Sequence, residues 1–323
     1  MNNSKSGYLL ISLDFELLWG IFDVVDYTSK KKYFKQTRAV IPEILKLFEE
    51  YQVHATWATV GMLFNKNWEE WEENIPDTIP KYKNKALSAY NFGQSIKSKS
   101  TEEFCFAPEL IQIISKTQGQ ELATHTYSHY YCLEEGQTPQ NFDNDLAMAV
   151  YLAKGLNINL KSLVFPRNQL SAGYLKICAA HGIKNIRSNP ISWYWKDPTS
   201  NSLSNKIART GDAYLNFGKK SYAASQLSPK KNLPLEQKAS RFLRPVEGNG
   251  VLRNRKINRI RNEIEWTARN KEIYHLWWHP HNFGDQPEES LKDLRKILVY
   301  FKEMQHKYNF QSLNMQELGT MYS

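Results

Sequence analysis

The 323-residue chain has few cysteines and no long apolar run. Its three cysteines, Cys105, Cys132 and Cys178, are odd in number and widely spaced, which argues against a disulfide framework and against a zinc site built from four thiolates. No apolar stretch reaches the roughly 18 residues that a membrane-spanning helix needs. The apolar stretch near the N-terminus is broken by Asp14 and Glu16, so it is too short and too acidic for the core of a signal peptide. We therefore expect a cytoplasmic protein without a transmembrane segment.

The basic surplus of the chain is confined to one region. The net charge is +9, and residues 201–270 alone contain fifteen Lys and Arg against five Asp and Glu. Such a segment is either a solvated face or a surface that attracts phosphate on a lipid, a nucleotide or a nucleic acid, and composition does not distinguish these. No nucleic-acid-binding motif accompanies the charge, so we expect no nucleic-acid partner.

Strand-like and helical segments alternate along the chain, which predicts an α/β fold. Short apolar runs typical of strands occupy 8–14, 53–60, 122–125, 160–165, 185–187, 273–279 and 310–313, and helical periodicity covers 38–50, 108–118, 142–156, 172–181 and 291–304. Strands separated by helices favour parallel pairing, because a parallel partner needs a long crossover. A (β/α) barrel and a doubly wound sheet fit this pattern equally well. We expect one catalytic domain over 1–323, with insertions around 64–107 and 193–250.

Two polar motifs follow strand-like runs in the first half of the chain. Asp14 and Glu16 are two residues apart on the first strand, so both carboxylates should project from the same face. His125 and His129 follow the run at 122–125, and two imidazoles four residues apart can hold one divalent ion.

Two further polar clusters follow later strands. The segment from His275 to Gly284 ends an apolar strand at His279, followed by Pro280 and His281, with neighbouring tryptophans, Trp278 among them, that would wall a pocket.

The other cluster is Arg167-Asn168, which follows the strand at 160–165. Arg167 could hold a nearby aspartate ionised and oriented by a charge-assisted hydrogen bond. All four clusters fall at the carboxyl ends of expected parallel strands, where barrels and open α/β sheets place their active sites. Two histidines and a carboxylate around one ion, with a second carboxylate as base and a histidine as acid, predict a hydrolytic site.

At these residues the chain resembles the polysaccharide deacetylase family, carbohydrate esterase family 4. The family's first motif, usually T-F-D-D, corresponds to Ser12-Leu13-Asp14-Phe15 followed by Glu16, and its H-[ST]-x-x-H motif corresponds to the segment from His125 to His129. The resemblance implies a distorted (β/α) barrel with loop insertions, and removal of acetyl groups from sugars by a metal-activated water. It implies Asp14 as base and Glu16, His125 and His129 as metal ligands, with the reverse assignment of the two carboxylates left open.

The remaining motifs of the family assign further roles. Its R-x-P motif corresponds to Pro166-Arg167, which implies that Arg167 tethers the base, and its L-x-H motif corresponds to the segment ending at His279, which implies the general acid. His281 is the alternative acid. We expect Trp278, His281 and Asn168 to bind substrate, and one divalent ion, Zn²⁺ by default.

The leading hypothesis is a metal-dependent hydrolase that removes an acyl group, N-acetyl foremost, from a sugar or sugar precursor of a surface polysaccharide. The resemblance extends to cytoplasmic members associated with bacterial surface-polysaccharide synthesis, which implies a substrate linked to a nucleotide or to a polyprenyl phosphate. The alternatives are a catalytically silent carbohydrate-binding relative, and a deformylase or cyclic amidohydrolase on the same scaffold. The oligomeric state is left open.

Overall fold

The computed structural model describes residues 6–190, 192–195, 202–212, 218, 220–247 and 250–322. Its centre is one parallel sheet with the strand order β6-β5-β4-β3-β2-β1-β8-β7, in which β9 also pairs with β1. The strands are β1 (Tyr8–Phe15), β2 (Ala55–Thr59), β3 (Gln120–Thr124), β4 (Ser162–Val164), β5 (Asn185–Ser188), β6 (Leu235–Lys238), β7 (Arg241–Phe242), β8 (Ile273–Trp278) and β9 (Gln311–Leu313).

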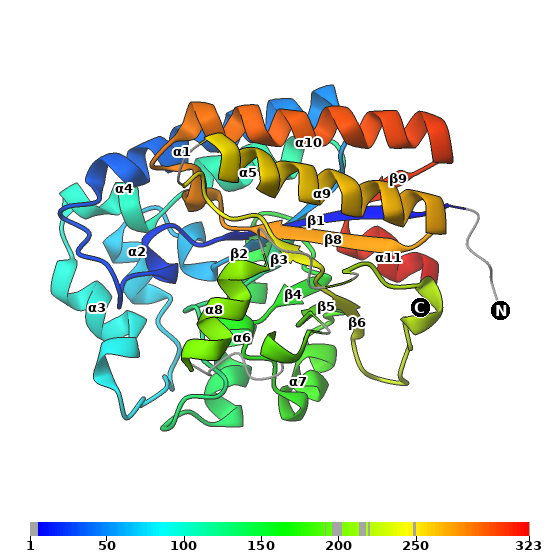
Figure 1. Cartoon of the computed structure of the whole chain (residues 1–323). Helices are drawn as coiled ribbons and strands as arrows, with labels where there is room; N and C mark the ends of the chain where they lie inside the picture. Colours follow the sequence, from blue (N-terminus) through cyan, green and yellow to red (C-terminus); the bar gives the residue numbers. More distant parts are fainter. Residues whose placement is uncertain are drawn as a thin grey trace.

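Helices connect the strands and cover the outside of the sheet. They are α1 (Lys31–Glu50), α2 (Trp68–Glu73), α3 (Ala89–Ile96), α4 (Glu102–Cys105), α5 (Pro108–Lys116), α6 (Pro139–Gly155), α7 (Leu175–Ala180), α8 (Leu203–Gly211), α9 (Gly250–Asn270), α10 (Pro287–Tyr308) and α11 (Met315–Tyr322). The long helices α1, α9 and α10 run side by side along β1 and β8 (Figure 1). No helix of the described residues combines the length and the apolar character needed to cross a membrane.

One bent segment closes the sheet into a distorted barrel. β6 pairs with β5, whereas β7, two residues further on, pairs with β8. Between them the Ala239 amide donates to the carbonyl of Ser188, and the Ser240 amide donates to the carbonyl of His275, each at 2.8 Å. The two edges of the sheet are thus bridged by a single stretch of chain, and the (β/α) barrel expected from the sequence is confirmed. This stretch lies within 193–250, so part of that region belongs to the barrel wall.

Alternation along β1 separates two apolar clusters. Leu9, Ile11 and Leu13 point outward into the large core between the sheet and the helices, while Tyr8 and Leu10 point into the barrel. The interior cluster also contains side chains from β8 and from α11, which covers the amino-terminal end of the strands (Figure 1). Apolar packing therefore fills the lower half of the barrel. The inward positions further along the strands are polar, and they form the site.

Candidate active site

The two acidic residues of the first motif lie at the carboxyl end of β1. Asp14 is the next inward position after Ser12, and Glu16 directly follows the strand on the same side. Each is only 2% exposed. The expectation that both carboxylates share one face therefore agrees with their placement, and both line a pocket of about 180 Å³ at the mouth of the barrel.

The histidine pair surrounds one oxygen of Glu16. Oε2 of Glu16 lies 3.1 Å from Nε2 of His129 and 3.4 Å from Nε2 of His125. Nδ1 of His125 lies 2.8 Å from the carbonyl oxygen of Val164, and Nδ1 of His129 lies 3.1 Å from the hydroxyl of Tyr131. These contacts to Nδ1 aim both Nε2 atoms at Glu16.

The protonation of this group fits a bound cation. A carbonyl oxygen only accepts, so Nδ1 of His125 carries a proton, and Nε2 is the ring nitrogen left to contact Glu16 or a cation. Burial lowers the pKa of His129, although Glu16 acts to raise it. Burial also acts to raise the pKa of Glu16, but the surrounding imidazoles, His279 foremost, hold it well below its usual value. Oε2 of Glu16 has no hydrogen-bond partner although it is buried. Two imidazole nitrogens and one ionised carboxylate oxygen gathered in a buried pocket are a donor set that suits a zinc-class ion.

A buried aspartate holds the backbone between the two histidines. Asp145 of α6 accepts hydrogen bonds from the amides of Tyr127 and Ser128, at 2.6 and 3.1 Å, and from the hydroxyl of Ser128. Burial raises the pKa of Asp145 to about 6, although these hydrogen bonds act to lower it. The segment needs such support because Thr126 and His129 have φ of 62° and 55°, in the left-handed region that is costly for these residues.

The second oxygen of Glu16 faces another pair of imidazoles. Oε1 lies 3.6 Å from Nε2 of His279 and 3.6 Å from Nδ1 of His281. His279 directly follows β8, and Pro280 begins a 3-10 helix (Pro280–Phe283) that turns the chain back over the barrel mouth. Nε2 of His279 also lies 3.7 Å from Oδ2 of Asp14. The fold therefore places His279, from the last motif, next to the carboxylates of both Asp14 and Glu16 from the first motif.

An arginine from β5 holds the other carboxylate. The guanidinium of Arg187 donates to both oxygens of Asp14 at 2.7 Å, and also to the hydroxyl of Ser12 at 3.0 Å and to Oδ1 of Asn168 at 3.3 Å. Burial acts to raise the pKa of Asp14, but the charge and hydrogen bonds of Arg187 outweigh it and leave the pKa below its ordinary value. Asp14 is therefore an oriented anion.

Arg167 does not occupy the tethering position expected from the sequence. Its guanidinium pairs with Asp23 and lies over the ring of Tyr131, 4.5 Å from the ring centre. Arg167 and Asn168 both have left-handed backbones, with φ of 52° and 55°, so the chain turns here and the arginine points away from Asp14. Arg167 still lines the pocket, and through Tyr131 it supports His129.

The expected substrate contacts are corrected at one position. Trp278 is fully buried and stacks on Phe283 in the outer core, because it points away from the barrel. Trp277 faces inward, lines the pocket and covers the guanidinium of Arg187 at 4.3 Å. Asn168 lines the pocket as expected.

Two residues of the site, Arg187 and Asp145, were not singled out from the sequence, and Trp277 was expected only as one of the tryptophans that wall the pocket. Arg187 ends a strand-like run, and a charged residue there is a usable signal for a site at the strand ends. Trp277 is two residues before His279, so strand alternation places it on the same side as that histidine. Asp145 lies inside a helix, and no local pattern distinguishes it from a surface carboxylate.

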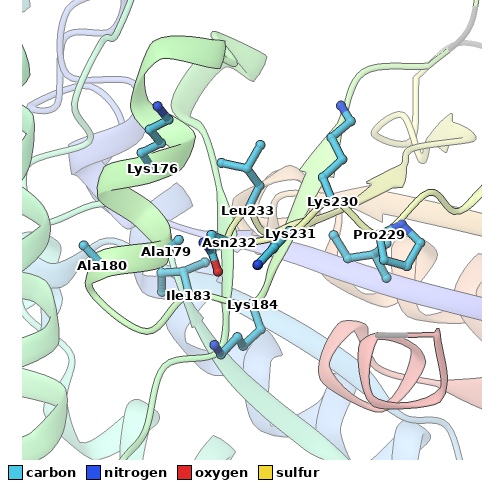
Figure 2. Close-up of a pocket in the computed structure, with 11 residues that line it drawn as sticks. Lys176, Ala179, Ala180, Ile183, Lys184, Pro229, Lys230, Lys231, Asn232 and Leu233 are labelled. Atoms are coloured by element: carbon cyan, nitrogen blue, oxygen red, sulfur yellow. The ribbon is translucent and has the colours of Figure 1, made fainter.

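The basic segment contributes ion pairs to the fold and residues to a second pocket. Among the described residues, six basic residues of the segment form ion pairs: Lys220, Lys230, Arg241, Arg253, Arg259 and Arg269. All but Arg253 pair with acidic residues of the segment itself, so most of its basic surplus remains. A pocket of about 900 Å³ lies before β5 and β6, at the amino-terminal ends of these strands. Its lysines, Lys176, Lys184, Lys230 and Lys231, extend in different directions (Figure 2). The residues of the candidate site converge at the other end of the barrel.

A family model places the chain among known proteins. Residues 22–186, a little over half of the sequence, match the model named polysaccharide deacetylase. The chain belongs to the polysaccharide deacetylase family. The matched range includes His125 and His129, whereas Asp14, Glu16 and His279 lie outside it. Membership of the family indicates a hydrolase that acts on acetylated carbohydrate.

Solved structures share the deacetylase fold over nearly the whole chain. A protein from Mycobacterium smegmatis, assigned as a polysaccharide deacetylase, aligns with a TM-score of 0.62 at 13% identity, covering 100% of this chain and 92% of that one. A protein from Pseudomonas aeruginosa PAO1, assigned likewise, gives 0.59 at 11% identity, with 98% and 91% covered. Puue allantoinase gives 0.58 at 11% identity, with 99% and 91% covered. At such identities the likeness concerns the fold. No curated protein matches the sequence.

Proposed function

We propose that this protein is a metal-dependent deacetylase that hydrolyses the N-acetyl group of a sugar or sugar precursor of a surface polysaccharide, with 1–323 acting as one catalytic domain. The observation that carries the proposal is the convergence on Glu16, whose unpartnered buried Oε2 faces the imidazoles of His125 and His129. The cysteines Cys105, Cys132 and Cys178 are free and buried, which supports the cytoplasmic location expected from the sequence.

Glu16, His125 and His129 would hold the cation, and their donor atoms all lie within 4.8 Å of one another. When bound, a divalent ion lowers the pKa of a water molecule to about 7 and stabilises negative charge on an acyl oxygen. Zn²⁺ suits this set of two nitrogens and one oxygen best.

Asp14 is the proposed base. Its lowered pKa keeps it ionised at neutral pH, and Arg187 fixes its orientation toward the pocket. It takes a proton from the attacking water as the new C–O bond to the acyl carbon forms. Arg187 is a positioning residue in this scheme, because it contacts Asp14 from the barrel interior.

His279 is the proposed acid. Its Nε2 lies 3.6–3.7 Å from oxygens of Glu16 and Asp14, at the pocket wall. It donates a proton to the amide nitrogen as the C–N bond breaks, so one water and one acetamide yield a free amine and acetate. Asn282 lies 3.3 Å from Nδ1 of His279 and orients the ring.

The pocket favours a small acyl group on a sugar ring. Its volume of about 180 Å³ suits an acetyl group, and the ring of Trp277 forms an apolar wall against which a sugar could lie. Arg167 and Asn168 supply polar contacts on the rim. The group to which the sugar is linked can be identified by comparing free, nucleotide-linked and polyprenyl-phosphate-linked N-acetyl sugars as substrates.

The test is release of acetate from these three groups of sugars by the Zn²⁺-loaded protein. We expect Asp14→Asn to lower the rate by about 10²–10⁴-fold, the usual effect of losing a general base. Asp143→Asn, which removes a carboxylate that pairs with His181 away from the site, is the matched control and should leave the rate unchanged. Binding of sugar without any release of acetate would favour a catalytically silent carbohydrate-binding protein. Release of formate would favour a deformylase, and opening of a cyclic amide would favour a cyclic amidohydrolase.

A further inference from the structure

The side of Glu16 opposite His125 and His129 carries a second set of ligand atoms. Oε1 of Glu16, Nε2 of His279 and Nδ1 of His281 lie within 4.8 Å of one another. His281 is 5% exposed, and its Nδ1 has no hydrogen-bond partner. A buried imidazole nitrogen without a partner costs free energy unless a proton or a cation satisfies it.

The local fold aligns these atoms. The rings of His279 and His281 stack with centres 4.8 Å apart and planes 12° from parallel. As a result, one nitrogen of each ring lies 3.6 Å from the same carboxylate oxygen. Nδ1 of His279 lies 3.3 Å from Oδ1 of Asn282, which only accepts, so Nδ1 carries a proton and Nε2 is the nitrogen directed at Glu16, where it can hold either a proton or a cation. Both rings therefore direct one nitrogen at the same carboxylate oxygen, as His125 and His129 do at the other oxygen of Glu16.

We propose that Glu16, His279 and His281 form a second, weaker site for a zinc-class divalent cation, so that Glu16 bridges two ions at high metal concentration. We further propose that the second ion inhibits the enzyme, and this part rests on the function proposed above. A cation on Nε2 of His279 removes that nitrogen as a proton donor, so the amine cannot leave.

The second site is weaker for an electrostatic reason. The carboxylate of Glu16 is already shared with the first ion, and the charge of Asp14 is compensated by Arg187. A second divalent charge in the same buried pocket is therefore repelled by the first, with little remaining negative charge to offset it. The affinities of the two ions should be separable in one titration.

The experiment is calorimetric titration of the metal-free full chain with Zn²⁺ alone, with the bound metal counted after dialysis. We expect two ions per chain in the wild type, one tight and one weaker by at least about tenfold. His281→Phe keeps a stacking ring and removes the ligand nitrogen, so it should bind one ion, with the affinity of the tight ion retained. The affinity for the second ion should fall by more than about 10–100-fold, which is the usual effect of losing only a hydrogen bond that supports a metal ligand.

The matched control is His306→Phe, which removes an exposed imidazole of α10 and should bind two ions like the wild type. If His281→Phe does not fold, as judged by the absence of a cooperative thermal transition, His281→Gln replaces it in the titration. In activity assays excess Zn²⁺ should inhibit the wild type, and inhibition of the His281 variant should need at least about tenfold more metal.

Each stoichiometry decides a different claim. One ion in the wild type up to millimolar Zn²⁺ overturns the second site and leaves the proposed function standing. No ion in the wild type overturns both. Two ions in His281→Phe, or loss of both ions from a folded variant, overturns the second site, since His281 would then be either no ligand or a ligand of the first ion.

Discussion

Arg187→Met tests the arrangement of the base most sharply. The side chains of Arg187 and Asp14 are 1% and 3% exposed, and two 2.7 Å hydrogen bonds join them. Removing one partner of a buried pair leaves an uncompensated charge and costs about 3–5 kcal/mol. Because whole domains are stable by only about 5–15 kcal/mol, this loss should be plain in urea denaturation at neutral pH.

The same substitution should change the pH dependence of catalysis. With Arg187 absent, the contribution of burial to the pKa of Asp14 is no longer outweighed, so the pKa rises and the base is protonated at higher pH. The acid limb of the kcat/KM profile should move upward. In the wild type the lowered pKa of Asp14 stabilises the fold above about pH 3.9, the pKa of an unfolded aspartate, and this contribution is lost as the pH falls further.

Arg167→Met is the control, because Arg167 is the arginine that the sequence motif favours for this role. Arg167 pairs with Asp23, whose side chain is only 7% exposed, so the loss of Arg167 should also cost stability. The acid limb should stay in place, because Arg167 points away from Asp14. An acid limb that moves in Arg167→Met and stays in Arg187→Met would refute the reasoning. So would an Arg187→Met protein as stable as the wild type.

Two further predictions concern other parts of the fold. Trp278→Ala should lower the free energy of unfolding by about 3–5 kcal/mol through the cavity it leaves in the outer core, whereas Trp277→Leu should lower kcat/KM roughly 2- to 10-fold through loss of an aromatic wall; equal effects of both on kcat/KM would contradict their opposite orientations. His54 contacts Glu317 of α11 at 2.8 Å, and this hydrogen bond raises the pKa of His54 although burial acts to lower it. The pair therefore stabilises the fold below about pH 6.5 and this contribution is lost as the pH rises through the raised pKa. Urea denaturation of the wild type should therefore give a larger contribution of this pair to the free energy of unfolding at about pH 6 than at about pH 9. The same pH difference in His54→Gln would contradict this assignment.

The parallel α/β sheet could be predicted because its main signals are local, whereas the choice of a barrel over a doubly wound sheet rested on the family resemblance. Apolar strands alternating with amphipathic helices require long crossovers and hence parallel pairing, whatever the details of packing. The alternation of side chains along a strand likewise placed Asp14 and Glu16 on one face. β6 and β7 were missed because their sequences, LEQK and RF, are mostly polar and form no apolar run.

The tether of Asp14 could not be identified from local sequence. Arg187 is 173 positions away from Asp14, and only the register of the strands between them brings the two together. The motif at Pro166-Arg167 offered an arginine at the correct end of the barrel, but its left-handed backbone turns that side chain toward Asp23. Trp277 rather than Trp278 faces the pocket because side chains alternate along β8, and Trp277 is two residues from His279. Closeness to His279 in the sequence does not distinguish the two tryptophans.

The central claim is a divalent ion between Glu16, His125 and His129, and X-ray absorption of protein loaded with one equivalent of Zn²⁺ tests it most directly. The account predicts nitrogen and oxygen neighbours at about 2.0–2.2 Å, two of them imidazoles, with one imidazole lost in His125→Gln and the ion still bound. An ion bound only by exposed groups, with a spectrum unchanged in His125→Gln, or no stoichiometric ion at all, would contradict it.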